Sequence, residues 1–177
     1  EITVEAKSEE FTYDGTEKSV SGLETMTFEV VGNTYTVEGL SASASGTDAG
    51  TYTSEVTGEA KVFDSKHRDV TEQFIVNRQD GTLTINPIQI TLTSATAQKE
   101  YDGTPLTSTE VQVVGQYIGD DLSNIRATGT VTYPDTTVPN TIEYDTGSGF
   151  KSQNYNIIEH VGQLTVTNRT AKYEVFV

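Results

Sequence analysis

The chain has 177 residues, with 26 acidic and 11 basic side chains that give a formal net charge of −15. This charge repels phosphate backbones and argues against nucleic acid as a partner, and the lack of any run of about 18 apolar residues argues against insertion into a membrane. The chain contains no cysteine, which excludes disulfides, thiolate metal sites and a cysteine nucleophile.

Strands are predicted wherever apolar residues alternate with polar ones, and the 30 threonines suit the pleated surface that strands present. Such alternation joins Phe28 with Val30, Tyr35 with Val37, Leu83 with Ile85, Ile88 with Ile90 and Leu92, Val111 with Val113, Val131 with Tyr133, Leu164 with Val166, and Tyr173 with Val175 and Val177. The one helix-like stretch, Asp120–Ile125, starts with acidic residues but supplies barely two turns. The pattern therefore predicts an all-β protein.

Two blocks of sequence occur twice, in the same order. The first, Tyr13-Asp14-Gly15-Thr16, recurs 88 residues later as Tyr101-Asp102-Gly103-Thr104. The second, Gly81-Thr82-Leu83-Thr84-Ile85, matches Gly162-Gln163-Leu164-Thr165-Val166 after a shift of 81. The blocks open and close two copies of one unit, so we predict tandem modules of residues 1–87 and 88–177.

The junction between the modules has no flexible linker. From residue 82 to residue 93 the strand pattern is interrupted only by Asn86-Pro87, and proline belongs at the start or edge of a strand. We therefore expect the units to stack end to end with little hinge freedom, as in a stalk.

The repeated blocks are best explained by structure. Asp-Gly is a strong turn signal, so Asp14, Gly15 and Thr16, like Asp102, Gly103 and Thr104, are expected to form turns. Tyr13 and Tyr101 would pack on the core beside them, the functional alternative being that a sugar stacks on these rings. Gly81 and Gly162 are expected to turn the chain into the last strand of each unit.

A search for catalytic chemistry finds little in the sequence. His67 lies in the charged run 64–69, which predicts a solvated loop, and His160 is predicted to lie in a hairpin turn. No Gly-x-Ser-x-Gly motif supports a serine nucleophile, and with 26 acids a pair of carboxylates discriminates nothing. We therefore expect no enzyme activity and no catalytic residue.

Two further possibilities concern a metal ion and a crosslink. Calcium is more plausible than zinc because oxygen ligands abound, with Asp120-Asp121 and the pair Asp64 and Asp69 as contributors, although no Asp-x-Asp-x-Asp-Gly loop occurs. Isopeptide bonds from Lys7 to Asn86 and from Lys99 to Asn168 are a second hypothesis, since they would join early and late strands.

The second module resembles the YDG-type (MBG-like) repeat of bacterial cell-surface and adhesin-like proteins. The resemblance is carried by Tyr101-Asp102-Gly103-Thr104-Pro105-Leu106, Gly119-Asp120, Asn154-Tyr155-Asn156-Ile157 and Gly162-Gln163-Leu164-Thr165-Val166-Thr167. The first module matches at its Tyr-Asp-Gly-Thr start, around Ala49-Gly50-Thr51-Tyr52, and at its end. It departs where Gln73-Phe74 replaces Asn154-Tyr155.

This resemblance implies an extracellular β-rich module on the cell surface, with no catalytic residues to carry over. The expected fold is a pair of immunoglobulin-like sandwiches or related sheets, the alternative being a β-grasp-like sheet with one short helix. The chain begins at Glu1 without an initiator methionine or signal peptide, so we expect a segment of a longer protein that is anchored to the cell wall elsewhere.

Three functions stay open at this point. The first is a non-catalytic spacer whose partners are the neighbouring repeats of the parent chain. The second is an adhesin module that binds mucin, glycan or a host matrix protein. The third is an accessory segment of a large extracellular carbohydrate-active enzyme.

Overall fold

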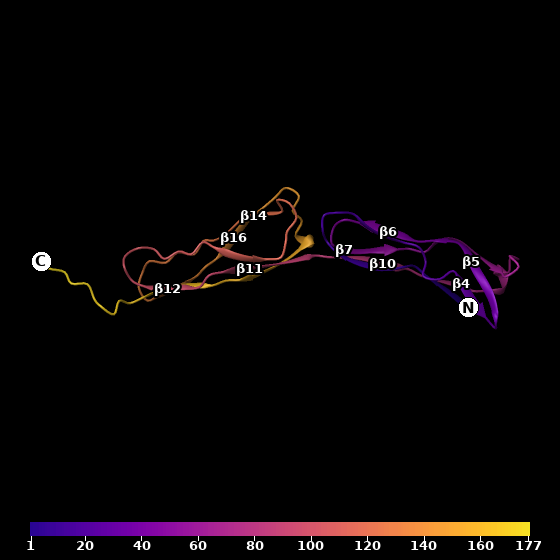
Figure 1. Cartoon of the computed structure of the whole chain (residues 1–177), viewed down its shortest axis with the longest axis horizontal. Helices are drawn as coiled ribbons and strands as arrows, with labels where there is room; N and C mark the ends of the chain where they lie inside the picture. Colours follow the sequence, from indigo (N-terminus) through magenta and orange to yellow (C-terminus); the bar gives the residue numbers. More distant parts are fainter. The chain divides into compact units, whose positions relative to one another are not determined.

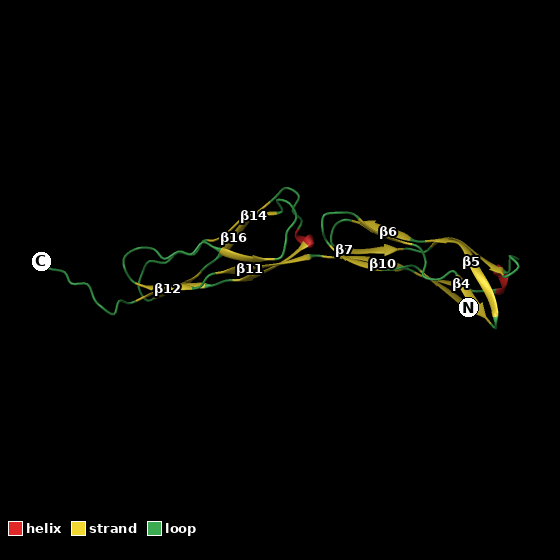
Figure 2. Ribbon diagram, viewed as in Figure 1, coloured by secondary structure: helices red, strands yellow, loops and turns green.

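A computed structural model describes all residues from 1 to 177, and nearly all of its regular structure is β-strand (Figures 1 and 2). It contains eighteen strands and two three-residue 3₁₀ turns but no α-helix. The chain divides into two compact units, Glu1–Pro87 and Ile88–Val177. The predicted all-β class is therefore confirmed, and the several small sheets are consistent with a β-sandwich. The β-grasp alternative lacks the helix that it needs.

The first unit is built from ten strands. They are β1 (Ile2–Glu5), β2 (Glu9–Thr12), β3 (Lys18–Ser21), β4 (Thr27–Val30), β5 (Asn33–Ser41), β6 (Ser43–Gly46), β7 (Gly50–Ser54), β8 (Thr57–Asp64), β9 (Val76–Gln79) and β10 (Gly81–Asn86), with the turn η1 (Thr71–Gln73). The strand orders in its sheets are β1-β9, β2-β10-β7, β3-β6 and β4-β5-β8.

The second unit is built from eight strands. They are β11 (Ile88–Ser94), β12 (Ala97–Glu100), β13 (Val111–Val114), β14 (Leu122–Ala127), β15 (Thr136–Pro139), β16 (Ile142–Thr146), β17 (Tyr155–His160) and β18 (Gln163–Thr167), with the turn η2 (Ser152–Asn154). The strand orders in its sheets are β13-β11-β17, β12-β18-β15 and β14-β16.

In each unit the first part of the chain pairs in parallel with the last part, and we call this pairing the terminal ribbon. In unit 1, β1 pairs with β9 and β2 pairs with β10, so that Ile2 lies opposite Val76. In unit 2, β11 pairs with β17 and β12 with β18, so that Ile90 lies opposite Ile157. Ile90 lies 88 residues after Ile2, and Ile157 lies 81 residues after Val76. These are the shifts of the two repeated sequence blocks, so both units share one register.

The alternation of the ribbon strands decides which side chains form the core. Leu83 and Ile85 of β10 are buried, as are Leu164 and Val166 of β18, whereas Thr82 of β10 points outward and is exposed. Burying side chains of this size is worth roughly 2 kcal/mol each. The strands predicted around Phe28, Tyr35, Leu83, Ile90, Val111 and Leu164 are all present.

At three places the local structure differs from the strand and helix patterns of the sequence. The helix-like stretch Asp120–Ile125 forms no helix, because Leu122 and Ala127 are buried in strand β14, which pairs with β16. Tyr133 lies outside any strand, just before a proline, and is 77% exposed. The alternating run from Tyr173 to Val177 forms no strand, because no neighbouring strand pairs with it, and its apolar side chains stay exposed.

Glycine allows the terminal ribbon to bend where the two strands approach most closely. A Cβ atom on Gly162 would lie 2.3 Å from the carbonyl oxygen of Ala95, and one on Gly81 would lie 2.3 Å from that of Lys7. The prediction that His160 lies in a hairpin turn is wrong, because His160 is the last residue of strand β17. After a bend at Val161-Gly162 the chain continues along the same ribbon as β18. Gly81 and Gly162 bend the ribbon without reversing the chain.

We expect Gly162→Ala to lower the free energy of unfolding by about 2 kcal/mol or more, because the added methyl group meets backbone that cannot move aside without breaking the ribbon. Gly149→Ala is the matched control, since the nearest atom to its added Cβ is a carboxylate oxygen of Asp121 at 3.8 Å. That control should change stability by less than about 0.5 kcal/mol. Urea unfolding measures both, and equal stability of the two variants would contradict the close-approach explanation.

Beside this bend, unit 2 buries a hydrogen-bonded asparagine. Asn140 is fully buried, and its side-chain amide donates to the carbonyl oxygens of Ala95 (3.1 Å) and Ser108 (2.9 Å) while its Oδ1 accepts from the Gly129 amide at 3.1 Å. Its own carbonyl oxygen accepts from the hydroxyl of Ser94 at 2.7 Å. The asparagine thus gives hydrogen-bond partners to backbone groups from three separate segments of unit 2.

At the corresponding position, unit 1 has a serine whose hydroxyl forms no hydrogen bond. Ser54 lies opposite Gly81 and is fully buried, and its hydroxyl has no hydrogen-bond partner. We expect Asn140→Ala to lower the free energy of unfolding by about 3 kcal/mol, because three partly buried hydrogen bonds to the backbone are lost together with the packing of a fully buried side chain. Ser54→Ala should be neutral or stabilising, because it removes an unsatisfied hydroxyl. A comparable loss of stability in both variants, measured by urea unfolding, would contradict this account.

Candidate functional site

The Tyr-Asp-Gly-Thr motif of unit 2 forms a turn closed by a carboxylate. Asp102 accepts hydrogen bonds from the backbone amide of Thr104 (2.9 Å) and from its hydroxyl (2.6 Å), while Gly103 adopts a positive φ of 79°. The ammonium of Lys99 donates to the same carboxylate at 2.9 Å. The aspartate therefore orders the turn and holds a cation on it.

The motif of unit 1 builds the same turn. Asp14 accepts from the backbone amide of Thr16 at 2.9 Å and from its hydroxyl, and Gly15 has a φ of 81°. The cation is Lys18, whose Nζ lies 2.7 Å from the carboxylate.

The two units take this lysine from different positions. Lys99 precedes its aspartate, and the residue that corresponds to it in unit 1 is Phe11. Lys18 follows its aspartate, and the residue that corresponds to it in unit 2 is Leu106. In unit 1 the displaced ammonium still lies 5.5 Å from the centre of the Phe11 ring. An apolar side chain and a lysine have exchanged places, and the ion pair with the carboxylate is kept in both units.

These contacts lower the pKa of both aspartates. The bonds from Lys18 and Thr16 hold the pKa of Asp14 well below its usual range, and bonds from a threonine and a lysine do the same for the pKa of Asp102. Because the pKa is lower in the folded chain than in the unfolded one, the ionised turn stabilises the fold above about pH 4. That contribution disappears as the pH falls through the folded pKa.

We expect Lys99→Met to raise the pKa of Asp102 toward its usual value, although the bonds from Thr104 keep it somewhat low. The acid-unfolding midpoint of unit 2 should move to higher pH. Titration of carboxyl carbons by nuclear magnetic resonance gives the pKa directly, and Asp14 of unit 1 serves as an internal control that should not change. An Asp102 pKa identical to that of the parent chain would contradict the role given to the lysine.

The tyrosines of the two motifs differ in exposure. Tyr13 is 8% exposed, so its ring offers no surface for a sugar. Tyr101 packs beside the buried cluster around Leu164 but keeps part of its ring accessible. It lines a pocket of about 370 Å³, which we call the Tyr101 pocket; the other lining residues are Pro134, Asn168, Arg169, Lys172 and Tyr173.

The C-terminal segment that forms one wall of this pocket is held in place by hydrogen bonds. The amide and hydroxyl of Thr170 donate to Glu100 of β12 at 3.2 and 3.0 Å, and these bonds lower the pKa of Glu100. The Arg169 guanidinium carbon lies 4.0 Å from the centre of the Tyr173 ring, and its Nε donates to the carbonyl oxygen of Ala171 at 2.8 Å. The wall is thus fixed to the end of the terminal ribbon.

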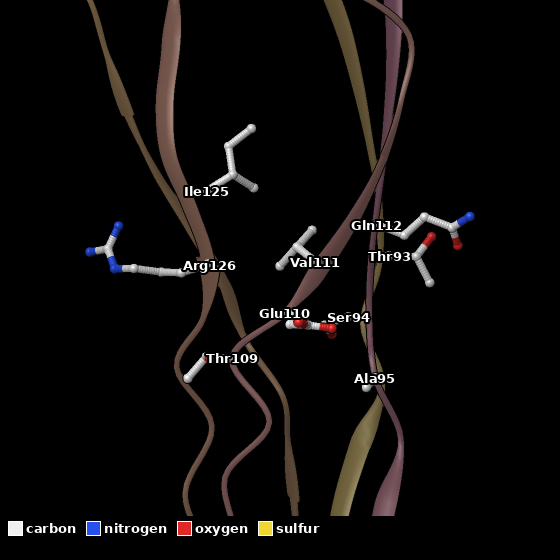
Figure 3. A pocket seen from close by; sticks show the side chains of 9 residues that line it. All are labelled: Thr93, Ser94, Ala95, Thr109, Glu110, Val111, Gln112, Ile125 and Arg126. Atoms are coloured by element: carbon white, nitrogen blue, oxygen red, sulfur yellow. The ribbon is translucent and has the colours of Figure 1, made fainter.

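A larger open groove of about 730 Å³ lies between the chain segments around β11, β13 and β14 (Figure 3). It is lined by Thr93, Ser94, Ala95, Thr109, Glu110, Val111, Gln112, Ile125 and Arg126. Figure 3 shows the Arg126 side chain extending away from the groove, and its Nη2 lies 3.8 Å from Glu143. The groove contains one carboxylate and no histidine, so it can form hydrogen bonds to a polar chain but brings together no nucleophile and base.

The remaining candidates from the sequence have structural partners. His67 lies in the predicted loop after β8 and stacks on Phe63 with 4.4 Å between ring centres. Asp64 accepts from the backbone amide of Arg68 and from its guanidinium, and Asp69 accepts from Thr71. These contacts lower the pKa of both aspartates.

The structure gives other hydrogen-bond partners to several of the residues considered for calcium and for crosslinks. Asp121 is buried and accepts from the Tyr155 hydroxyl, and no group of three or more histidines and acidic residues is placed to hold a metal ion. The side chain of Asn86 donates to Glu10 at 2.7 Å, and the Lys99 ammonium is on the Tyr-Asp-Gly-Thr turn.

The structure also gives residues roles that the sequence analysis did not assign to them. Arg169, Lys172 and Tyr173 form the wall of the Tyr101 pocket, and Asn140 supports the bend of the ribbon. The signal for the first group is a local excess of cations in a strongly acidic chain. Asn140 carries no such signal, because its importance lies in being buried.

Searches of family models, curated proteins and solved structures return no match to this chain. None of its helical turns is long or apolar enough to cross a membrane.

Proposed function

We propose that this chain is a non-catalytic spacer of a bacterial cell-surface protein and that its two units carry tension. The observation that supports this role is the terminal ribbon, in which the first and last strands of each unit pair in parallel along most of their length. The repeated Tyr-Asp-Gly-Thr blocks and the resemblance to surface repeats support the extracellular setting.

Parallel pairing determines how a stretched unit responds to force. The start of the first strand and the end of the last strand lie at opposite ends of a parallel ribbon, so a pull on the two termini slides the strands past each other. All ladder hydrogen bonds are then loaded together, whereas a force applied at one end of a ribbon separates them one at a time. The ribbon of unit 2 extends from the pair Ile88 and Tyr155 to the pair Glu100 and Thr167.

The connection between the units adds little slack. Strand β10 ends at Asn86 and β11 begins at Ile88, so Pro87 alone separates two ribbon strands. Proline fixes its own φ near −65° and has no amide hydrogen to leave unpaired. Tension leaving the last strand of unit 1 therefore passes through one stiff residue into the first strand of unit 2.

We expect single-molecule stretching through the chain termini to show two unfolding events of similar force, each releasing roughly 300 Å of chain at about 3.5 Å per residue. The natural chain has no cysteine, so introduced cysteines give unique attachment points. Attachment through Gln89→Cys and Asn156→Cys, a facing pair at one end of the unit 2 ribbon, should unfold that unit at a markedly lower force. Equal forces in the two geometries would refute the proposed role of the ribbon under tension.

A second candidate is an adhesive role for unit 2. It is supported by the Tyr101 pocket, where aromatic rings and cations are exposed beside each other. A spacer and an adhesive module are compatible, because the pocket lies at the Tyr-Asp-Gly-Thr turn and uses none of the hydrogen bonds within the ribbon.

A further inference from the structure

The Tyr101 pocket is lined by positive charge, although the chain as a whole is strongly acidic. The chain has 26 acidic and only 11 basic residues, yet two cations, Arg169 and Lys172, line this one small pocket and no carboxylate lines it. The ammonium of Lys172 makes no ion pair or hydrogen bond. A free ammonium beside an arginine offers a local attraction for an anion that the net charge of −15 would otherwise repel.

Two aromatic rings accompany these cations. Tyr101 is anchored by its backbone amide, which donates to the carbonyl oxygen of Thr167 at 2.9 Å, and by its contact with the buried cluster of unit 2. Tyr173 is 59% exposed and carries the guanidinium of Arg169 against its ring. Flat apolar rings with polar edges suit the face of a sugar, whose C–H groups pack on the ring while its hydroxyls keep their hydrogen bonds.

The pocket is ordered before any ligand arrives. The bonds from Thr170 to Glu100 fix the C-terminal wall to β12, and Arg169 is oriented by Ala171 and by the Tyr173 hydroxyl, which accepts from its Nη1 at 3.2 Å. Glu100 lies close enough for Arg169 to lower its pKa, so part of the arginine charge is already compensated. Lys172 is therefore the cation most available to a ligand.

From this arrangement we propose that the Tyr101 pocket binds an anionic saccharide. The sugar ring packs against the tyrosines, and its acidic group pairs with Lys172 and with the remaining N–H groups of Arg169. A volume of about 370 Å³ accommodates one or two sugar rings rather than a long chain. This inference goes beyond the spacer role and does not depend on it, because the force experiment and the binding experiment test different parts of unit 2.

The test is a titration of the full chain, followed by nuclear magnetic resonance, with 3′-sialyllactose, sulfated lactose, lactose and acetate. We expect the two acidic sugars to shift the signals of Tyr101 and of residues 168–173 with millimolar affinity. Lactose and acetate should bind about tenfold more weakly, since each lacks one half of the recognised group. Binding of acetate as tightly as sialyllactose, or of lactose as tightly as either acidic sugar, would overturn the assignment.

Variants locate the site. Lys172→Gln and Tyr173→Ser should each weaken sialyllactose binding roughly fivefold, equivalent to about 1 kcal/mol, and both residues are exposed, so folding should be unaffected. Lys66→Gln removes the same charge from an exposed loop of unit 1 and is the matched control. Unchanged binding in both pocket variants, or an equal loss in the Lys66 control, would show that the anion is attracted elsewhere.

Discussion

The rest of the structure depends on the parallel pairing between the first and last strands of each unit. This pairing requires two backbones to approach within a distance that excludes a side chain, which is why Gly81 and Gly162 stand at the bends. Beside the bend of unit 2, Asn140 gives hydrogen-bond partners to backbone groups of Ala95, Ser108 and Gly129. The core residues then follow from the ribbon, because alternate side chains of its strands all point to the same interior.

The fold class could be predicted from the sequence because strand alternation is a local signal. Leu83 with Ile85 and Leu164 with Val166 show it clearly, and all four are buried. The same signal failed for Tyr173 to Val177, since alternation shows that a segment can form a strand but does not supply a partner strand. The helix-like stretch Asp120–Ile125 became a strand because burial of Leu122 outweighed the weak helix preference of its acidic start.

The candidate site was only partly accessible from the sequence. The turn role of the Tyr-Asp-Gly-Thr blocks follows from the chemistry of Asp-Gly, but the lysine that joins each turn comes from a different position in each copy and cannot be found by aligning them. The Tyr101 pocket needs Arg169 to be folded back onto Tyr173, a tertiary contact that spacing along the chain does not reveal.

The terminal ribbon also has a consequence for how the chain acquires its structure over time. Its contacts join residues far apart in sequence, such as Ser8 with Thr82, 74 residues apart, and Ser94 with Gly162, 68 residues apart. Closing such long loops costs chain entropy before the ribbon contacts can offset it, which makes folding slow. No unit can complete its ribbon until its final strand is available. A unit that leaves a narrow channel N-terminus first therefore stays unfolded until nearly all of its residues have passed through. Only then can its last strand pair with its first.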